Sequence, residues 1–312
     1  MKCLVTGGSG FIGSNLVDKL IEMSYDVVVV DDESATAHDQ FYYNPKAKYY
    51  KYDICDYGNT RPLYDGVDYV FHLAAESRIQ PTIENPVGAV MTNTLGTATV
   101  LQCSREAKVK RLMYSSTSSA YGLANRPPLK EIMPTDCLNP YSVSKVAGES
   151  LCKMYYDLYG LETIVFRYFN VYGPRQPMRG QYAPVIGLFL RQKDAGESLT
   201  IVGDGSQRRD FTHVNDVVNA NILAATTVFD DNPPAGISTY VTKPFGQIYN
   251  VGTGKNHSVL DLAIMISDNI TFIPARLGEA KESLANNNRI KEYFDWTPTI
   301  KLEDYIREQL NG

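Results

Sequence analysis

The sequence lacks the features that several large classes of protein require. It contains no run of about 18 apolar residues of the kind that forms a membrane-spanning helix. No long apolar stretch follows Met1, so a signal peptide is not expected. Lys and Arg number 30 against 35 Asp and Glu, and the net charge of -5 disfavours binding to a nucleic-acid backbone. We therefore predict a soluble cytoplasmic protein that binds neither nucleic acid nor membrane.

Cysteine and histidine are scarce, and their positions do not indicate a metal site. The five cysteines are scattered without a C-x-x-C pair, and the four histidines show no metal-ligand spacing. These patterns predict buried free thiols in a reducing compartment and no bound metal ion. With 312 residues and 44% hydrophobic content, the chain is long and apolar enough to form the core of an enzyme.

Short apolar runs alternate with helix-length segments in the first half of the chain. The first 30 residues predict a strand at 3–6, a helix at 11–22 and a second strand at 27–30. Three further apolar runs predict additional strands: 69–73, 111–115 and 163–167. Strands that alternate with helices predict an α/β fold, a doubly wound parallel sheet covered by helices on both faces.

The pattern changes in the second half, where a loop rich in Pro and Gly precedes shorter elements. A helix at 214–228 and a strand at 247–251 indicate that the chain returns to the first sheet before it ends. We therefore predict a first domain over 1–170, with returning segments near 213–252. The remaining chain, 171–312, is predicted to form mainly a smaller lobe.

A glycine loop joins the first predicted strand to the first predicted helix. Gly7, Gly10 and Gly13 form a G-x-x-G-x-x-G pattern, which permits a sharp turn and the approach of a pyrophosphate to the helix N-terminus. Asp31 ends the second strand, where a carboxylate accepts hydrogen bonds from ribose hydroxyls and repels a 2′-phosphate. The βαβ context therefore predicts a dinucleotide site in which NAD is favoured over NADP.

Tyr141 and Lys145 are four residues apart, so a helix places both side chains on one face. A free tyrosine has a pKa near 10 and is a poor base at neutral pH. A neighbouring ammonium favours the phenolate, which makes Tyr141 a candidate proton acceptor. The spacing also arises by chance in a chain with 22 tyrosines. The hydroxyl-rich segment 114–122, directly after a predicted strand, supports the catalytic interpretation.

Together these motifs resemble those of extended short-chain dehydrogenase/reductases, in the NAD-dependent epimerase/dehydratase branch. The resemblance implies a Rossmann-type sheet with a smaller C-terminal substrate-binding lobe. It also implies a set of NAD-binding residues: Gly7, Gly10, Phe11, Ile12, Gly13, Asp31, Asp53, Ile54, Leu73, Ala74, Ala75, Asn93, Tyr141 and Lys145.

The same resemblance implies a catalytic set of three residues: Thr117, Tyr141 and Lys145. Related nucleotide-sugar dehydratases and decarboxylases have an Asp-Glu or Ser-Glu pair just after the hydroxyl residue, whereas this chain has Ser118 and Ser119. Loss of water from the sugar needs an additional acid or base, so this difference favours an epimerase. The stretch 74–77 nevertheless resembles that of 4,6-dehydratases, which keeps a dehydratase as the alternative.

Two stretches in the second half, 167–175 and 203–211, resemble the nucleotide-sugar-binding segments of UDP-glucose 4-epimerase-like enzymes. The resemblance implies that Asn170 contacts the diphosphate or the sugar. It further implies that Arg209 and Arg276 clamp the diphosphate, which suits the forked donors of a guanidinium.

The resemblance also extends to the nucleobase and the sugar. It places Phe211 near the nucleobase. It places Ser283 at a position where a bulky tyrosine accompanies restriction to non-acetylated hexoses. A small residue there leaves room for a 2-acetamido group.

The resemblance as a whole implies an NAD-dependent UDP-sugar 4-epimerase that works through a 4-keto intermediate. The expected substrates are UDP-GlcNAc/UDP-GalNAc, UDP-glucose/UDP-galactose, or both pairs. A nucleotide-sugar 4,6-dehydratase and a non-catalytic NAD-binding protein remain the alternatives. The segments 94–107 and 141–159 resemble the family's dimer helices, so a homodimer is expected.

Overall fold

The computed structural model describes residues 1–35, 38–178, 183–229, 243–274 and 281–311. Its largest element is a seven-stranded parallel sheet with the order β11-β6-β5-β4-β1-β2-β3. The strands are β1 (Lys2–Thr6), β2 (Asp26–Val30), β3 (Lys48–Tyr50), β4 (Tyr69–His72), β5 (Arg111–Thr117), β6 (Glu162–Tyr168) and β11 (Gln247–Val251). The order reverses direction at β1, which confirms the predicted Rossmann-type, doubly wound α/β sheet.

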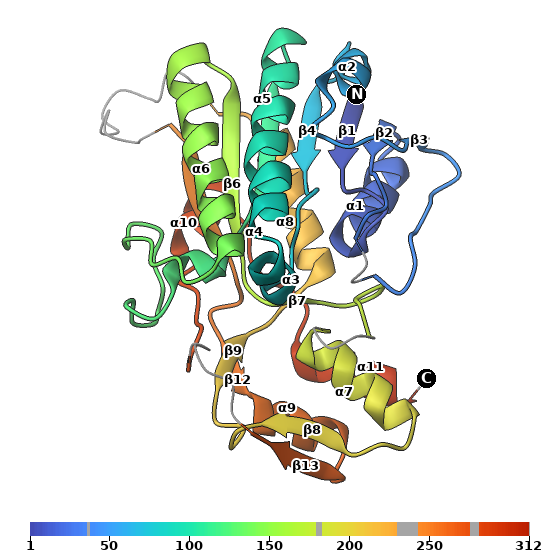
Figure 1. Cartoon of the computed structure of the whole chain (residues 1–312), viewed down its shortest axis with the longest axis vertical. Helices are drawn as coiled ribbons and strands as arrows, with labels where there is room; N and C mark the ends of the chain where they lie inside the picture. Colours follow the sequence, from blue (N-terminus) through green and yellow to red (C-terminus); the bar gives the residue numbers. More distant parts are fainter. Residues whose placement is uncertain (36–37, 179–182, 230–242, 275–280, 312) are drawn as a thin grey trace.

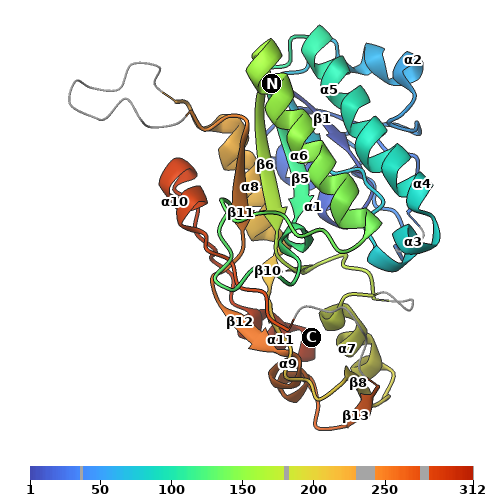
Figure 2. The ribbon, with the colours of Figure 1, turned by 60° about the vertical axis from the view of Figure 1, so that its left-hand side comes forward.

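Helices cover both faces of this sheet, as Figures 1 and 2 show. One face is covered by α1 (Phe11–Glu22), α8 (Val214–Thr226) and α10 (Asn288–Phe294). The other is covered by α2 (Tyr57–Thr60), a 3-10 turn at Arg61–Tyr64, α5 (Thr97–Glu106) and α6 (Pro140–Tyr159). Side chains alternate along each strand, so Cys3 and Val5 pack into one apolar cluster and Leu4 into the other. Burial on both faces explains why these strands are continuously apolar.

The smaller lobe lies below the carboxyl ends of the strands in Figure 1. It contains α7 (Val185–Asp194), β8 (Leu199–Val202), β9 (Arg208–Asp210), β12 (Asn256–Ser258), α9 (Val259–Ile266), β13 (Ile270–Ile273) and α11 (Leu302–Asn311). Its own apolar cluster packs α7, α9 and α11 against β8. Two short strands, β7 (Val171–Tyr172) and β10 (Thr212–His213), pair with each other between the two parts. The division of the chain at residue 170 remains a prediction.

Most predicted elements form where their patterns indicated, with differences at the ends. The predicted helix at 94–107 is irregular: a π-helical stretch at Met91–Gly96 precedes α5. Short helices α3 (Ile79–Glu84) and α4 (Pro86–Val90) lead into it, and a 3-10 turn at Ser118–Tyr121 follows β5. Within the described residues, no helix has both the length and the apolar character needed to cross a membrane.

A buried ion pair joins α6 to the sheet. Arg167 in β6 donates from Nε and Nη2 to Glu149 in α6, at 2.9 and 2.7 Å, and both side chains are at most 5% exposed. Ser116 in β5 donates to the same carboxylate at 2.5 Å. These bonds hold the middle of α6 against β5 and β6, near the carboxyl ends of both strands.

Candidate active site

A cavity of about 950 Å³ opens at the carboxyl ends of the parallel strands, between the sheet and the smaller lobe. This edge is where open α/β sheets bind their ligands, because loops diverge there at the reversal of strand order. Of the predicted site residues that the structure describes, all except Asn93 line this cavity. Arg276 lies outside the described residues.

The glycine loop forms the floor of one end of the cavity. Gly7 has a φ of +70°, and a Cβ there would lie 2.7 Å from the backbone nitrogen of Ala74. A Cβ on Gly13 would collide with the carbonyl oxygen of Gly7. Gly10 is the N-cap of α1 and provides no side-chain cap, so the first N–H groups of the helix are available to a bound anion. The loop therefore fits the pyrophosphate of a dinucleotide.

Asp31 lies beside this loop at the end of β2. Its carboxylate accepts hydrogen bonds from the backbone N–H groups of Ser9 and Glu33, both at 2.9 Å. Burial raises the pKa of Asp31, whereas these two bonds lower it. A carboxylate has about four lone-pair sites, so acceptor capacity remains for ribose hydroxyls. This arrangement favours a free ribose over a phosphorylated one.

The remaining predicted cofactor residues divide into cavity-lining and supporting positions. Asp53, Ile54 and the segment 73–75 line the cavity between the glycine loop and Tyr141. Asn93 is fully buried behind this wall. Its amide accepts from the Glu76 N–H at 2.8 Å, and donates to the Glu76 carbonyl at 3.0 Å and to Ser144 Oγ at 2.9 Å. These contacts assign it to holding the loop after β4 against α6 rather than to direct contact with a ligand.

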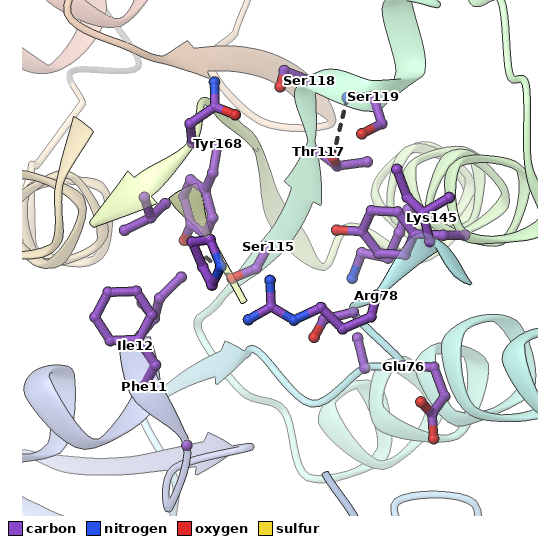
Figure 3. Close-up of a pocket in the computed structure, with 18 of the residues that line it drawn as sticks. Phe11, Ile12, Glu76, Arg78, Ser115, Thr117, Ser118, Ser119, Lys145 and Tyr168 are labelled. Carbon is purple, nitrogen blue, oxygen red and sulfur yellow. Dashed lines mark hydrogen bonds between the residues drawn. The ribbon is translucent and has the colours of Figure 1, made fainter. Parts of the chain in front are cut away.

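The predicted catalytic residues line the cavity from β5 and α6, and Figure 3 shows two of them, Thr117 and Lys145. Helix α6 begins with a capping box formed by Asn139 and Ser142, which places Tyr141 in its first turn at the cavity. Burial raises the pKa of Tyr141, whereas a hydrogen bond with Thr117 and the positive charge of Arg78 lower it. Thr117 is thus positioned to share a proton with the phenol.

Lys145 lies one turn further along α6 and is 2% exposed. Its Nζ is 4.3 Å from the centre of the Tyr114 ring. Burial lowers the pKa of Lys145 to about 7, opposed by the nearby Cys152 and Glu149. The ammonium therefore loses its proton near neutrality. Arg78 is a second cation near Tyr141, and its positive charge lowers the pKa of the phenol.

The opposite wall comes from the segment after β6 and from the smaller lobe. Asn170 has a φ of +25° and donates from Nδ2 to the Asp210 carbonyl at 2.8 Å and to Ser283 Oγ at 3.3 Å. The Ser283 hydroxyl also accepts from the Asp210 N–H at 3.3 Å. Arg209 and the buried Phe211 line the same wall. The predicted sugar and nucleobase residues thus face the catalytic residues across the cavity.

Sequence reasoning missed one conspicuous side chain in the cavity. Arg78 follows the predicted segment 74–77, and its guanidinium points into the cavity in Figure 3. A charged residue directly after a small-residue turn at the end of a parallel strand was the available signal. His38, Ser115 and Tyr168 also line the cavity without having been predicted.

A family model described as the NAD dependent epimerase/dehydratase family matches residues 3–252. The chain therefore belongs to this family of enzymes, and its cofactor is NAD. The residues around the glycine loop fit that cofactor.

Individual relatives share the whole length of the chain but differ in reaction. The UDP-glucose 4-epimerase of Mycolicibacterium smegmatis is 35% identical, over 98% of this chain and 96% of that protein. The UDP-N-acetyl-alpha-D-glucosaminuronate decarboxylase of Bacillus cytotoxicus is 32% identical, over 99% and 96%.

Solved structures agree with this fold over nearly their full length. The UDP-glucose 4-epimerase of Thermotoga maritima, solved with UDP-glucose, has a TM-score of 0.89 at 33% identity and covers 100% and 98% of the two chains. That of Thermus thermophilus, solved with NAD, has a TM-score of 0.85 at 27% identity, with the same coverage.

We predict that Gly13→Ala abolishes retention of NAD, because its methyl group collides with the Gly7 carbonyl in the phosphate-binding turn. The NAD content of the purified protein, measured by chromatography after denaturation, checks this. Gly58→Ala is the matched control, since a Cβ there would lie no closer than 3.5 Å to its neighbours. Equal NAD content in both variants would contradict the prediction.

We also predict that Lys145→Met removes an ionisation near pH 7 from the pH dependence of kcat/KM. Burial lowers the pKa of Lys145 to about 7, so its charge is present below that pH and lost above it. The rate should also fall by about 100-fold or more. The control is Lys153→Met, which alters an exposed lysine of the same helix that pairs with Asp157. An unchanged inflection in Lys145→Met would show that another group titrates there.

Proposed function

We propose that the protein is a UDP-sugar 4-epimerase that interconverts UDP-GlcNAc with UDP-GalNAc, UDP-glucose with UDP-galactose, or both pairs. One observation carries the proposal: Tyr141 and Thr117 line the same end of the cavity, which also presents the hydroxyls of Ser118 and Ser119. Such an end supports proton transfer at one hydroxyl of a sugar. Elimination of water needs an additional acid or base, which these hydroxyls do not supply.

In the proposed reaction, Tyr141 removes the proton of the C4 hydroxyl while Thr117 holds that oxygen by a hydrogen bond. The glycine loop and Asp31 would hold NAD, which when bound would supply the acceptor and donor of the C4 hydride. Arg209, which lines the cavity, holds the diphosphate, so the 4-keto sugar rotates without leaving the cavity. Tyr141 then returns the proton to the oxygen. The configuration at C4 is inverted, and no net oxidation occurs.

A nucleotide-sugar 4,6-dehydratase is the second candidate, and Glu76 is the observation that favours it. This carboxylate lines the cavity, and burial together with the charge of Asp32 raises its pKa. In Figure 3, however, it points away from Thr117 and Lys145. The orientation makes Glu76 poorly placed to protonate a leaving hydroxyl at the sugar, so we favour the epimerase.

We propose that two copies associate through the face formed by α4, the π-helical stretch and α6. The exposed apolar side chains of this face include Val87 at 72%, Leu95 at 45%, Val143 at 51% and Leu158 at 69%. Apolar side chains gathered on adjacent helices are typical of a protein interface.

The direct test is to incubate the protein with UDP-N-acetylglucosamine and, separately, with UDP-glucose, and to identify products by chromatography and NMR. The expected product is the C4 epimer, with no net reduction of NAD. Tyr141→Phe should lower the rate by about 10²–10⁴-fold, whereas Tyr159→Phe, an exposed tyrosine on the same helix, should not. Full turnover in Tyr141→Phe would exclude the mechanism, and a 4-keto-6-deoxy product would establish the dehydratase.

The two rates also test the proposed role of Ser283. A small residue there accommodates a 2-acetamido group, so UDP-N-acetylglucosamine should be turned over. In the companion variant Ser283→Tyr, the rate should fall more for UDP-N-acetylglucosamine than for UDP-glucose. An equal loss for both would indicate that Ser283 matters only for the bonds it makes with Asn170 and Asp210.

For the dimer, we expect light scattering to give twice the mass of one chain. Leu95→Glu should shift the protein toward the monomer, because a charge replaces an apolar contact at the centre of the proposed face. Ile132→Glu is the control, since Ile132 is 84% exposed in the loop between β5 and α6. Identical masses for both variants and the wild type would rule out this face as the interface.

A further inference from the structure

Asp210 is a fully buried carboxylate at the junction between the sheet and the smaller lobe. It ends β9, which lies between the large sheet and the rest of the smaller lobe in Figure 1. Its Oδ1 accepts from the N–H and the hydroxyl of Thr253, at 2.8 and 2.7 Å. Its Oδ2 accepts from the N–H groups of Gly254 and Ala285, both at 3.0 Å. A carboxylate has about four lone-pair sites, so these four donors use its whole acceptor capacity.

The four donors come from two segments that are distant from β9 in the sequence. Thr253 and Gly254 lie between β12 and β11, the edge strand of the large sheet. Ala285 is buried in the segment that precedes α10. Gly252 leaves room for the arrangement, since a Cβ there would collide with the Cβ of Ala285 and lie 3.1 Å from Asp210 Oδ2. One carboxylate therefore fastens β9 to both segments.

The residues around Asp210 form the cavity wall that the smaller lobe contributes. Its sequence neighbours Arg209 and Phe211 line the cavity. Its carbonyl accepts from Asn170 Nδ2 at 2.8 Å, and its N–H donates to Ser283 Oγ at 3.3 Å. Asn170 and Ser283 line the same cavity. The position of this wall thus follows the position of the Asp210 backbone.

Resting on the proposed 4-epimerase function, we propose that Asp210 is a positioning residue for the diphosphate of the sugar nucleotide. Its carboxylate holds the backbone that carries Arg209, and so sets the affinity for the nucleotide without taking part in proton or hydride transfer. A guanidinium forms two parallel hydrogen bonds with a phosphate only from the correct position, so a shift of β9 weakens binding. Because protein donors use all the lone pairs of Asp210, the carboxylate acts through its neighbours.

A neutral amide of the same size cannot replace this carboxylate. In Asp210→Asn, one oxygen becomes an NH2 group, which only donates. Two of the four donors then face another donor in a buried site and lose their acceptor, which is costly. We expect β9 to move away from the segment that carries those donors.

Asp216 in α8 provides a matched comparison, because it is also a buried carboxylate that anchors a distant segment. It accepts from the N–H and the hydroxyl of Thr299, at 3.0 and 2.8 Å, and from the Ile300 N–H at 3.2 Å. These bonds fasten the chain that leads into α11, whereas those of Asp210 fasten the cavity wall. Asp216→Asn therefore controls for the general effect of losing a buried anchor.

The test measures the affinity of the NAD-loaded protein for UDP by calorimetry. Asp210→Asn should weaken UDP binding by about 10–100-fold, and Asp216→Asn should change it by less than about threefold. Thermal unfolding of both variants measures the stability that each substitution removes. Equal weakening by both would show a general loss of stability and overturn the proposal. Unchanged affinity in Asp210→Asn would overturn it as well.

A milder pair of variants keeps the carboxylate, so the test does not depend on the folding of Asp210→Asn. Thr253→Val removes the hydroxyl donor to Oδ1 and should weaken UDP binding by about 3–10-fold. Thr253→Ser keeps a hydroxyl and should bind UDP as the wild type does. Equal affinity of these two variants would contradict the proposal.

Steady-state kinetics separates positioning from chemistry. With the sugar nucleotide that the protein epimerises, Asp210→Asn should raise KM by about 10–100-fold and change kcat by less than about threefold. The physical reason is that Tyr141 and Thr117 stay in place on α6 and β5. A lower kcat with an unchanged KM would overturn the inference.

The same measurements distinguish failure of the 4-epimerase function from failure of this inference. UDP binding that depends on Asp210, without any C4 epimer from the wild type, would refute the proposed reaction and leave the inference standing. Epimerisation by the wild type, together with UDP binding that is independent of Asp210, would do the reverse.

Discussion

The ion pair between Arg167 and Glu149 is the interaction on which the geometry of the site depends. It joins β6 to α6 through two hydrogen bonds in a nearly inaccessible interior, and Ser116 of β5 adds a third to the same carboxylate. Removing either charge would leave the other buried without a partner, which is strongly destabilising. Because the pair fixes the rotation of α6 about its axis, it determines that the side chains of Tyr141 and Lys145 face the ends of β5 and β6.

The two ends of the cavity carry ionisable side chains of opposite sign. The end beside the glycine loop has the carboxylates of Asp31 and Asp53. The reacting end has Arg78 and Lys145, the second with its pKa lowered to about 7 by burial. Low polarity strengthens each of these interactions. The protein therefore uses burial both to orient its ligands and to adjust the proton affinity of its catalytic groups.

Relatives of nearly the same length catalyse different reactions. An epimerase and a decarboxylase share more than 30% identity with this chain along almost its whole length. The glycine loop and the Tyr-Lys pair serve the oxidation of a sugar hydroxyl, a step that several outcomes can follow. The outcome depends on the few side chains that contact the sugar, which we propose include Thr117, Ser118 and Ser119. We therefore expect the reaction of each family member to depend mainly on the side chains around the sugar.

The sequence by itself determined the parts of the protein that arise from neighbouring residues. Strand alternation, the helix at 11–22, the glycine turn and the four-residue spacing of Tyr141 and Lys145 are local, because backbone sterics and helical periodicity act over a few residues. Only the tertiary structure decided that Asn93 lies behind the cavity wall, that Glu76 turns away, and that Arg78 lies close enough to Tyr141 to lower the pKa of the phenol. Those outcomes depend on solvent exclusion and on distances between segments far apart in the chain, which no local pattern records.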